Sequence, residues 1–537
     1  MPRIDAVLSA HSKAPSSSPA WLPKERGFSR RSFIAAAGAW LTWLHSRSAR
    51  GLAPADSYNV RRFGAMGDGA TLDTDAINRA ISTAAAAGGG WVDFPAGRYL
   101  CFTIHLRSHV TLRFAPGAVV IAATPDFSRP SRQYDFPEPQ PDSVAPYQDY
   151  GHNHWHNSLF WGEDLEGVAL TGQGELWGRG LEKGDGPAEE HPGAGNKVIA
   201  FKRCHNVLLR DVTIRQAGHF GILATAVDNL TMTNLRIDTG RDGIDIDSCR
   251  NVHIHACTVN SPFDDGIVLK SSYSLGSIRP TEQVTISDCT ITASYAVGSV
   301  LDDTYRPLLL GAAGGWPARV GRIKIGTETN GDIRNVVVSN CTFDGCHGLA
   351  VISEDGGVVE DVLFSNITMR NMVGPPIFVR LGGRLRSPAP VNPGEIRRVR
   401  FQQIDCVSAS SDDCSILAGI PGHPVKDIVV SNVRVQHQGA GKLRTGEISE
   451  QIAAYPEPNM FGDTPAHGFY LRHAQHIELQ DIIIEPGSPE PRPVVWMDDV
   501  SDAHMDNLRC TIPEASSVRG VNTQEIFLNG KLITPTP

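Results

Sequence analysis

The chain has 537 residues and a formal net charge of −9, from 49 lysines and arginines against 58 aspartates and glutamates. The two signs are mixed along the sequence and form no basic block, which excludes an electrostatic footprint for nucleic acid. Ten cysteines are scattered without the paired C-x-x-C spacing of metal sites. Cys257, Cys289 and Cys341 occupy the same place in a repeat, which favours small residues stacked inside a coil over a disulfide framework.

Residues 1–55 are predicted to be a twin-arginine signal peptide. The sequence SRRSFI at 29–34 leads into an apolar run at 33–44, and the Ala-Pro-Ala at 53–55 is a suitable cleavage site. The apolar run is too short to cross a bilayer as a stable helix. An uncleaved anchor is the alternative. We expect export of the folded protein to the periplasm or beyond, with no membrane attachment after cleavage.

Residues 56–123 are predicted to form an N-terminal cap and the first coils. Asp73 or Thr74 is placed to cap a helix over 76–87, and Gly residues at 88–90 end it. One face of this helix is apolar (Ile77, Ala80, Ile81 and Ala84). An amphipathic helix of this kind covers the open end of a solenoid.

Residues 124–200 are predicted to be a loop-rich insertion that walls a groove. Loops this long in a compact body are usually functional or disordered. Trp155, Trp161 and Trp177 indicate an ordered wall on which sugar rings stack, with Trp155 as a substrate-binding candidate. Three histidines alternate in HNHWH at 152–156, but no cysteine or acid stands nearby at ligand spacing. We therefore expect no metal.

Residues 201–537 are predicted to form the catalytic body, a parallel β-helix. The runs NVLLRDVTI, NLTMTNLRI and NVHIHACTV begin at Asn206, Asn229 and Asn251, at intervals of 23 (229 − 206) and 22 (251 − 229). A period of this length is typical of a solenoid, and the alternating β-branched residues make each unit a β-coil. Equivalent residues then stack about 4.8 Å apart. Breaks at 374–394 and 439–463 are predicted to be loops on the groove side.

An acidic stretch at 240–272 is the candidate catalytic centre. It carries the clusters Asp242/Asp245/Asp247 and Asp264/Asp265, and Asp242 and Asp264 lie 22 residues apart (264 − 242). One coil of 22 residues makes them neighbours. Crowded carboxylates share protons unequally, so that an acid and a base coexist, as glycoside hydrolysis requires. The alternative is that these residues only form turns.

Further candidates for substrate contact surround this stretch. Asp245 and Lys270 lie within it, and His219 lies one coil upstream, 23 residues before Asp242 (242 − 219). A histidine packed in the core is an equal alternative for His219. Arg322 and Lys324 share one face of a strand, a pair that suits a uronate carboxylate. A solvated strand face is the alternative for these two.

The chain resembles a known family in two places. Residues 58–120 resemble the entry module of the pectin-degrading right-handed β-helix enzymes. DGIDIDSC and DDGIVLKS, one coil apart, resemble the polygalacturonases of glycoside hydrolase family 28. The resemblance implies an all-β, pectate-lyase-like right-handed parallel β-helix and an inverting mechanism without metal or other cofactor. It makes Asp264 the general acid and Asp242 and Asp265 the residues that position and deprotonate water.

Departures from the family pattern lie close to these motifs. Gly240 and Arg241 stand where the family usually shows Asn and Thr, and its Gly-His-Gly motif has no clean match, with SYAVGSVLDD at 294–303 in that region. The segment at 325–336 also resembles the one that follows the family's histidine, which makes the alignment around Arg322 ambiguous.

The expected function is hydrolysis of a plant cell-wall pectic polysaccharide of the galacturonan or rhamnogalacturonan type, by a monomer. Two alternatives stay open. A lyase or epimerase on the same scaffold requires a basic proton abstractor and often Ca²⁺. A non-catalytic carbohydrate-binding solenoid has no need of a buried carboxylate cluster.

Overall fold

The computed structural model describes residues 57–148, 151–183, 191–309, 319–443, 447–513 and 517–537. The predicted signal peptide lies outside these residues. Within them, no helix combines the length and apolarity needed to cross a membrane.

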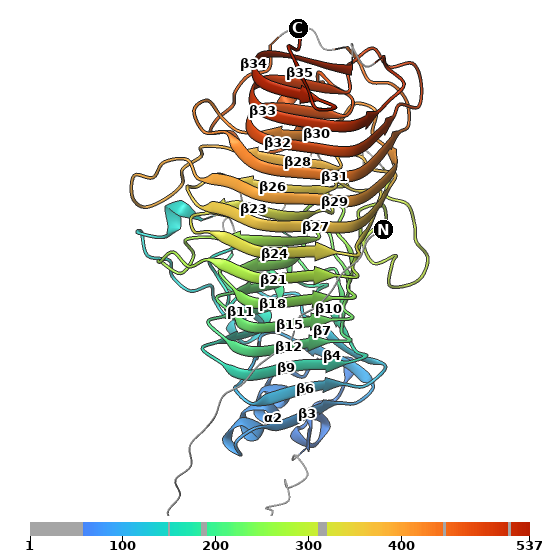
Figure 1. The fold of residues 1–537 in the computed structure, drawn as a ribbon. Helices are drawn as coiled ribbons and strands as arrows, with labels where there is room; N and C mark the ends of the chain where they lie inside the picture. The colour runs from blue at the N-terminus through green and yellow to red at the C-terminus, as the bar shows by residue number, and fades with distance from the viewer. Residues whose placement is uncertain (1–56, 149–150, 184–190, 310–318, 444–446, 514–516) are drawn as a thin grey trace, which may run out of the picture. The chain divides into compact units, whose positions relative to one another are not determined.

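Parallel strands stack coil upon coil in three columns (Figure 1). The first column contains β5 (Ile104–His105), β8 (Ser158–Glu163), β11 (Lys197–Lys202), β14 (Phe220–Thr225), β17 (Asp242–Asp247), β20 (Ile267–Ser271), β23 (Ile323–Thr329), β26 (Leu349–Ser353), β28 (Ile377–Leu381) and β30 (Ser415–Ala418). The second contains β1 (Ser57–Asn59), β3 (Gly90–Phe94), β6 (Val110–Phe114), β9 (Glu166–Gly172), β12 (His205–Arg210), β15 (Asp228–Thr233), β18 (Arg250–His255), β21 (Thr281–Ser287) and β24 (Ile333–Ser339). The third contains β2 (Asp68–Leu72), β4 (Gly97–Cys101), β7 (Ala118–Ala122), β10 (Glu175–Trp177), β13 (Thr213–Arg215), β16 (Arg236–Asp238), β19 (Thr258–Asn260), β22 (Thr290–Thr292) and β25 (Thr342–Asp344).

Longer strands continue the columns toward the C-terminus. Strands that run through more than one column are β27 (Val358–Arg370), β29 (Glu395–Ala409), β31 (Val425–His437), β32 (Phe469–Glu485), β33 (Val495–Arg509) and β34 (Val518–Leu528). The last strand, β35 (Lys531–Ile533), pairs antiparallel with β34 and ends the stack. The predicted all-β parallel β-helix is confirmed.

One α-helix, α2 (Thr74–Ala86), lies beside β1 and β3 at the N-terminal end of the described residues, after a short 3₁₀ turn at η1 (Val60–Phe63). The four residues of its predicted apolar face are buried, so it covers the first coils as expected. Asp73 precedes the helix, but its carboxylate does not cap it. The carboxylate accepts the backbone N–H groups of Met66 and Gly67 at 2.7 and 3.0 Å and so ties down the preceding turn.

The repeated asparagines mark the corner between the first and second columns. Asn206, Asn229 and Asn251 have φ values of 55°, 58° and 56°, a left-handed conformation that Asn tolerates better than most residues. Each side chain bonds to the next: Nδ2 of Asn229 donates to Asn206 at 2.9 Å, and Nδ2 of Asn251 donates to Asn229 at 2.8 Å. This ladder fixes the register of successive coils.

The interior of the stack is a continuous apolar core. Cys257, Cys289 and Cys341 are buried in it on successive coils, and no disulfide forms among the described cysteines. The stacking predicted for these three residues is therefore what the structure shows.

The predicted insertion at 124–200 is partly wrong. Strands β8, β9 and β10 within it make a complete coil, paired with β11, β12 and β13. The irregular parts are the stretch between β7 and β8, with 3₁₀ turns at η2 (Pro130–Arg132) and η3 (Ala145–Tyr147), and the stretch between β10 and β11. The sequence did not predict this coil because its corner residue is Gly167, with φ of 65°, where later coils have asparagine.

A second excursion crosses the outer face of the first column. We call residues 447–468 the strap; it contains the 3₁₀ turn η4 (Pro458–Phe461) and leads into β32. It begins within the predicted break at 439–463 and lies on the face that carries the acidic stretch.

Candidate active site

The three candidate catalytic aspartates come together at the start of β17 and in the turn before β20. One carboxylate oxygen from each of Asp242, Asp264 and Asp265 lies within 4.8 Å of the others. The register differs from the prediction by one residue, because Ile244 pairs with Ile267, an offset of 23 (267 − 244). That offset aligns Asp242 with Asp265 (242 + 23), where Asp264 was expected.

A single backbone amide joins the cluster. The N–H of Asp265 lies 3.1 Å from Oδ1 of Asp242 and 3.1 Å from Oδ1 of Asp264. The two carboxyls therefore converge on one donor. Their repulsion in a buried position is the condition under which one of them keeps a proton.

Asp242 is the member of the cluster that the site makes hardest to ionise. Its side chain is nearly inaccessible, with 4 % of the residue exposed. Burial, together with the nearby charges of Asp245 and Asp264, raises the pKa of Asp242 well above its usual value. The opposing effect of Lys270 is smaller.

Asp265 is the opposite case. Burial alone would raise its pKa, but the charges of Arg322 and Lys324 outweigh burial and bring the pKa well below its usual range. Nε of Arg322 donates to Oδ1 of Asp265 at 2.6 Å, and Nζ of Lys324 contacts Oδ2. Asp265, only 1 % exposed, is therefore a fixed carboxylate.

Arg322 and Lys324 were predicted to bind a substrate carboxylate, and in the structure both contact the carboxylate of Asp265. Both side chains are buried beneath Asp265. Arg322 also makes a bidentate pair with Glu457 of the strap, at 2.9 and 2.6 Å. A paired guanidinium without solvent access holds the site's own acids, so both cations position Asp265.

Asp245 and Lys270 form a second buried pair beside Asp242. Nζ of Lys270 lies 2.7 Å from Asp245 and 3.8 Å from both Asp242 and Glu328, and it contacts Nε2 of His152. Burial raises the pKa of Asp245 to about 6 against the attraction of Lys270. Asp245 and Lys270 were predicted to contact substrate; the structure shows both side chains inaccessible and paired with each other. The ammonium occupies the centre of the group, where it holds the carboxylates together.

Asp264 is the accessible carboxyl of the cluster. Its side chain is 25 % exposed and pairs with Nη2 of Arg241 at 2.9 Å. Arg241 occupies the position at which the family usually has threonine. Among the three aspartates, Asp264 is therefore the one placed to reach a substrate.

Two other predicted contacts are buried. Trp155 is fully inaccessible, and its Nε1 donates to Oγ1 of Thr225 at 3.0 Å, so it packs against the outer face of the first column with no face of its ring exposed. His219 is also buried, with Nδ1 3.3 Å from the carbonyl of Lys183. Burial, reinforced by Arg241, lowers the pKa of His219 well below its usual value, so it is neutral.

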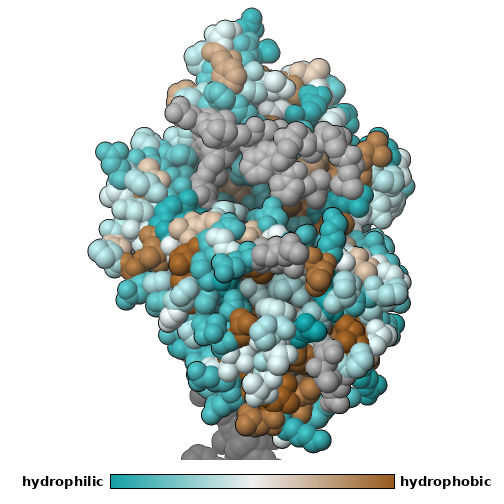
Figure 2. Space-filling view, turned by 90° about the horizontal axis from the view of Figure 1, so that it is seen from above, coloured by the Kyte–Doolittle hydropathy of each residue, from teal (hydrophilic) through white to brown (hydrophobic). Residues whose placement is uncertain are grey.

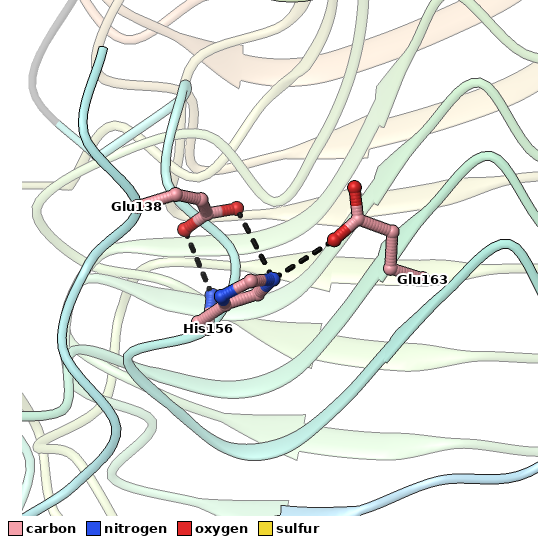
Figure 3. A group of neighbouring side chains, drawn as sticks. All are labelled: Glu138, His156 and Glu163. Atoms are coloured by element: carbon pink, nitrogen blue, oxygen red, sulfur yellow. Dashed lines mark hydrogen bonds and ion pairs between the residues drawn. The ribbon is translucent and has the colours of Figure 1, made fainter.

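His156 of the HNHWH run does meet acids (Figure 3). Its Nε2 lies 2.9 Å from Glu163 and 3.7 Å from Glu138, an arrangement able to hold a metal ion. However, Nζ of Lys202 lies 3.2 and 3.7 Å from the same two carboxylates, and Arg203 bonds to Glu163. These cations already balance the acids, and the group anchors the insertion to β8.

Several residues of the site were missed from the sequence. Tyr455 and Glu457 carried no signal because they approach from the strap, and Glu328 lies at the end of β23, outside the acidic stretch. Glu457 meets Arg322 across 135 residues. His152 was considered only as a metal ligand, although it touches Lys270.

Comparison with known proteins agrees with the fold. Residues 193–310 match the family model "Right handed beta helix region", and residues 57–139 match "Rhamnogalacturonase A/epimerase, pectate lyase-like". A probable polygalacturonase of Vitis vinifera is 25 % identical over 413 residues, which cover 71 % of this chain and 74 % of that protein.

Two solved structures have the same fold. A hyperthermoactive exopolygalacturonase from Thermotoga maritima aligns with a TM-score of 0.57 at 20 % identity, over 80 % of this chain and 92 % of that one. A family 28 exopolygalacturonase of Yersinia enterocolitica aligns with a TM-score of 0.58 at 16 % identity, over 89 % and 79 %. The chain is thus a right-handed parallel β-helix protein. Over most of its length it is similar to a probable polygalacturonase.

Proposed function

We propose that the protein is a glycoside hydrolase that cleaves the backbone of a pectic polysaccharide, of the galacturonan or rhamnogalacturonan type. The observation that carries the proposal is the aspartate cluster: three carboxyls from two adjacent coils, one kept protonated, one kept ionised and one open to solvent. The similarity to polygalacturonases supports the choice of polymer.

In this proposal Asp264 delivers a proton to the glycosidic oxygen. Asp242 and Asp264 converge on the amide of Asp265. The proton that Asp264 delivers is replaced from Asp242, whose pKa is raised, and Asp242 is thereby ionised. Asp265, ionised between Arg322 and Lys324, orients the attacking water, and Asp242 takes up the proton that the water loses as its oxygen bonds to the anomeric carbon. General acid–base catalysis of this kind is worth about 10²–10⁴-fold.

The direct test is to incubate the purified protein with homogalacturonan and with rhamnogalacturonan. New reducing ends without absorbance at 235 nm are expected. Chelator-sensitive release of unsaturated products would assign the protein to the lyases. The absence of new reducing ends from both polymers would contradict hydrolysis and favour a carbohydrate-binding solenoid.

We also propose that residues 1–55 direct export by the twin-arginine route. The motif is the sole support, since these residues lie outside the described structure. The double variant Arg30→Lys, Arg31→Lys is expected to leave the precursor in the cytoplasm, measured by fractionation. Normal export of the variant would contradict the proposal.

A further inference from the structure

Three arginines surround one tryptophan on the outer face of the third column. Trp177 ends β10, and the Cζ atoms of Arg215, Arg179 and Arg98 lie 4.1, 5.2 and 5.6 Å from the centroid of its ring. Arg215 is the register partner of Trp177 on the next coil, and Arg98 lies on β4, two coils upstream. We call these four residues the arginine cluster.

The tryptophan ring gathers the cations without neutralising them. Nε1 of Trp177 donates to Oε1 of Gln216 at 2.7 Å, which fixes the orientation of the ring. A cation near an aromatic ring is attracted by the quadrupole of the ring. This attraction takes up no hydrogen-bond acceptor, so the N–H donors of a guanidinium stay available for a carboxylate.

The cluster carries an excess of positive charge. Arg98 and Arg179 are exposed, and neither guanidinium has a carboxylate at ion-pair distance within the described part of the chain. Nη2 of Arg215 pairs with Oε1 of Glu175 at 2.5 Å. Three arginines against one glutamate leave a charge of +2, on a chain whose formal net charge is −9. Like charges brought together repel each other, and an anion bound between them removes the repulsion.

The cluster stands on the edge of the β-helix that leads to the aspartates. Trp177 and Arg215 end their strands where the third column turns into the first, and Asp264 lies in the equivalent turn after β19. Residues in register along this edge, in order, are Trp177, Arg215, Asp238 and Asn260. The cluster and the coil that carries Asp264 are therefore three coils, about 14 Å, apart.

The edge between the cluster and the aspartates is covered. Asp238 and Asn260 are inaccessible, and Asp238 accepts the backbone N–H of Val300 at 2.8 Å. Nη2 of Arg236 donates to the carbonyl of the same residue at 3.1 Å. An anion bound at the arginine cluster therefore lies outside the group of catalytic candidates.

We propose that the arginine cluster is a second binding site, which takes the carboxylates of an acidic polysaccharide and holds the polymer at the edge beside the aspartates. A guanidinium binds a carboxylate through two parallel hydrogen bonds, which suits the repeated carboxylates of a polyuronate. A neutral or esterified polymer lacks the group that is bound. The choice of a pectic polymer rests on the proposed function, whereas the recognition of carboxylates rests on the cluster itself.

Binding is tested by affinity electrophoresis of the full-length protein in native gels with polygalacturonate, relative to gels without polymer. The parent is Asp264→Asn, so that the polymer in the gel is not digested. Adding Arg98→Gln and Arg179→Gln is expected to weaken binding about tenfold or more, the loss for a charged hydrogen bond, with thermal unfolding unchanged. Arg210→Gln, at an exposed arginine on β12, is the matched control and should bind as the parent does. Equal binding by the double variant and its parent would overturn the proposal.

Carboxylate recognition is separated from general attraction between charges by Arg98→Lys with Arg179→Lys. These changes keep both charges but remove the planar forks, so most of the binding to polygalacturonate should be lost. Methyl-esterified pectin should be bound weakly by every variant. Binding at the level of the parent by the lysine variant, or an equal loss on dextran sulfate, would reduce the cluster to a patch for any polyanion and overturn the proposal.

The second site is separated from catalysis by rates of the active protein on two substrates. Arg98→Gln with Arg179→Gln should raise KM on polygalacturonate without changing kcat, and should keep the wild-type rate on a galacturonate disaccharide or trisaccharide. A loss of rate on the short substrate would place the cluster in the catalytic site and overturn the proposal. Binding that depends on the cluster, in a protein that hydrolyses no pectic polymer, would leave the second site standing and contradict the proposed function.

Discussion

The outer ladder is the line of residues in register on the outer face of the first column, from Trp161 to Trp496. Its middle and its two ends are built from the same repeat but have opposite chemistry. At the ends, the outward residues are apolar and are covered by other parts of the chain. In the middle, the face carries Asp242, Asp245, Asp265 and Lys324, all nearly inaccessible. Burial of charge costs stability unless each charge is paired. The middle of the ladder is thus the place where the fold buries charges at a cost in stability, and such clusters are typical of catalytic centres.

Buried charges also occur away from the aspartates, as in the pair of Arg492 and Glu490, whose side chains are each 1 % exposed. In the face seen in Figure 2, hydrophobic residues form separate patches among hydrophilic ones. A cavity of about 720 Å³ lies on the second column between Asn335 and His504, away from the aspartates. The site is therefore recognised by its cluster of buried carboxyls, not by cavity size.

The largest expected effect is on catalysis in the middle of the ladder. Asp264→Asn keeps the shape but removes the transferable proton, so the rate on pectic polymer should fall about 10²–10⁴-fold with folding intact. An aryl glycoside with an activated leaving group should escape part of this loss, because its departure needs little protonation. Initial rates on both substrates measure the effect. A wild-type rate on polymer would remove Asp264 from the acid role.

Lys270→Met breaks the buried charge balance. With Asp245 and Asp242 left without their cation, unfolding free energy should fall by about 3–5 kcal/mol. Denaturant unfolding measures it. The double variant Lys270→Met, Asp245→Leu should recover most of that loss, since both charges are gone. Equal loss in the single and double variants would contradict the pairing.

An apolar substitution at the covered end should lower the unfolding free energy by a similar amount, but through a cavity instead of an unpaired charge. Phe378→Ala opens a cavity under the strap and should lower the unfolding free energy by about 3–5 kcal/mol, the range for buried Phe→Ala. The matched variant Leu532→Ala, at an exposed position, should change it little. Thermal unfolding of both distinguishes them, and equal stability would show that the strap does not pack on Phe378.

The pH dependence of stability separates Asp245 from ordinary surface acids. Its pKa is raised from 3.8 to about 6. As the pH rises, Asp245 loses its proton at a lower pH in the unfolded chain than in the folded protein. Ionisation of Asp245 therefore lowers the free energy of unfolding between about pH 4 and pH 6. Asp245→Asn should flatten that part of the profile, measured by urea unfolding at a series of pH values. An unchanged profile would contradict the raised pKa.

The smallest effect is expected at the corner ladder, away from the site. Asn229→Ala removes two side-chain hydrogen bonds and places Ala in a left-handed conformation, which should cost about 1–3 kcal/mol without changing the pH profile. Asn432→Ala on a later coil, also with positive φ, serves as the comparison. Unaffected stability in both would mean that the corners do not hold the register.

The β-helix could be predicted from the sequence because each coil repeats the same pattern of corner and inward residues. Asn at the corners and alternating apolar residues recur from Asn206 onward, and they place the acidic stretch correctly on adjacent coils. The register was wrong by one because corners Asn229 and Asn251 are 22 apart, whereas strands β17 and β20 pair at an offset of 23. The additional residue lies in the turn before β20.

What the sequence could not predict comes from outside the repeat. The strap meets the site through Glu457, and the insertion meets it through His152, at separations that no local pattern encodes. Arg322 and Lys324 were placed on the correct face, but the pairing of Arg322 with Glu457 of the strap could not be predicted. The structure shows both cations bound to Asp265.

The stereochemistry of the first product tests the central claim most directly. The oxygens of Asp242, Asp264 and Asp265 lie within 4.8 Å of one another, closer than the carboxyl separation of about 6.5–9.5 Å usual for inverting enzymes and near the 5–5.5 Å of retaining ones. Asp265, however, is buried and bound to two cations, which leaves it to orient water and not to attack the sugar. Proton NMR of the earliest hydrolysis product should therefore show the inverted anomer, and a retained anomer would contradict the assignment of Asp264 as acid with Asp242 and Asp265 on the water.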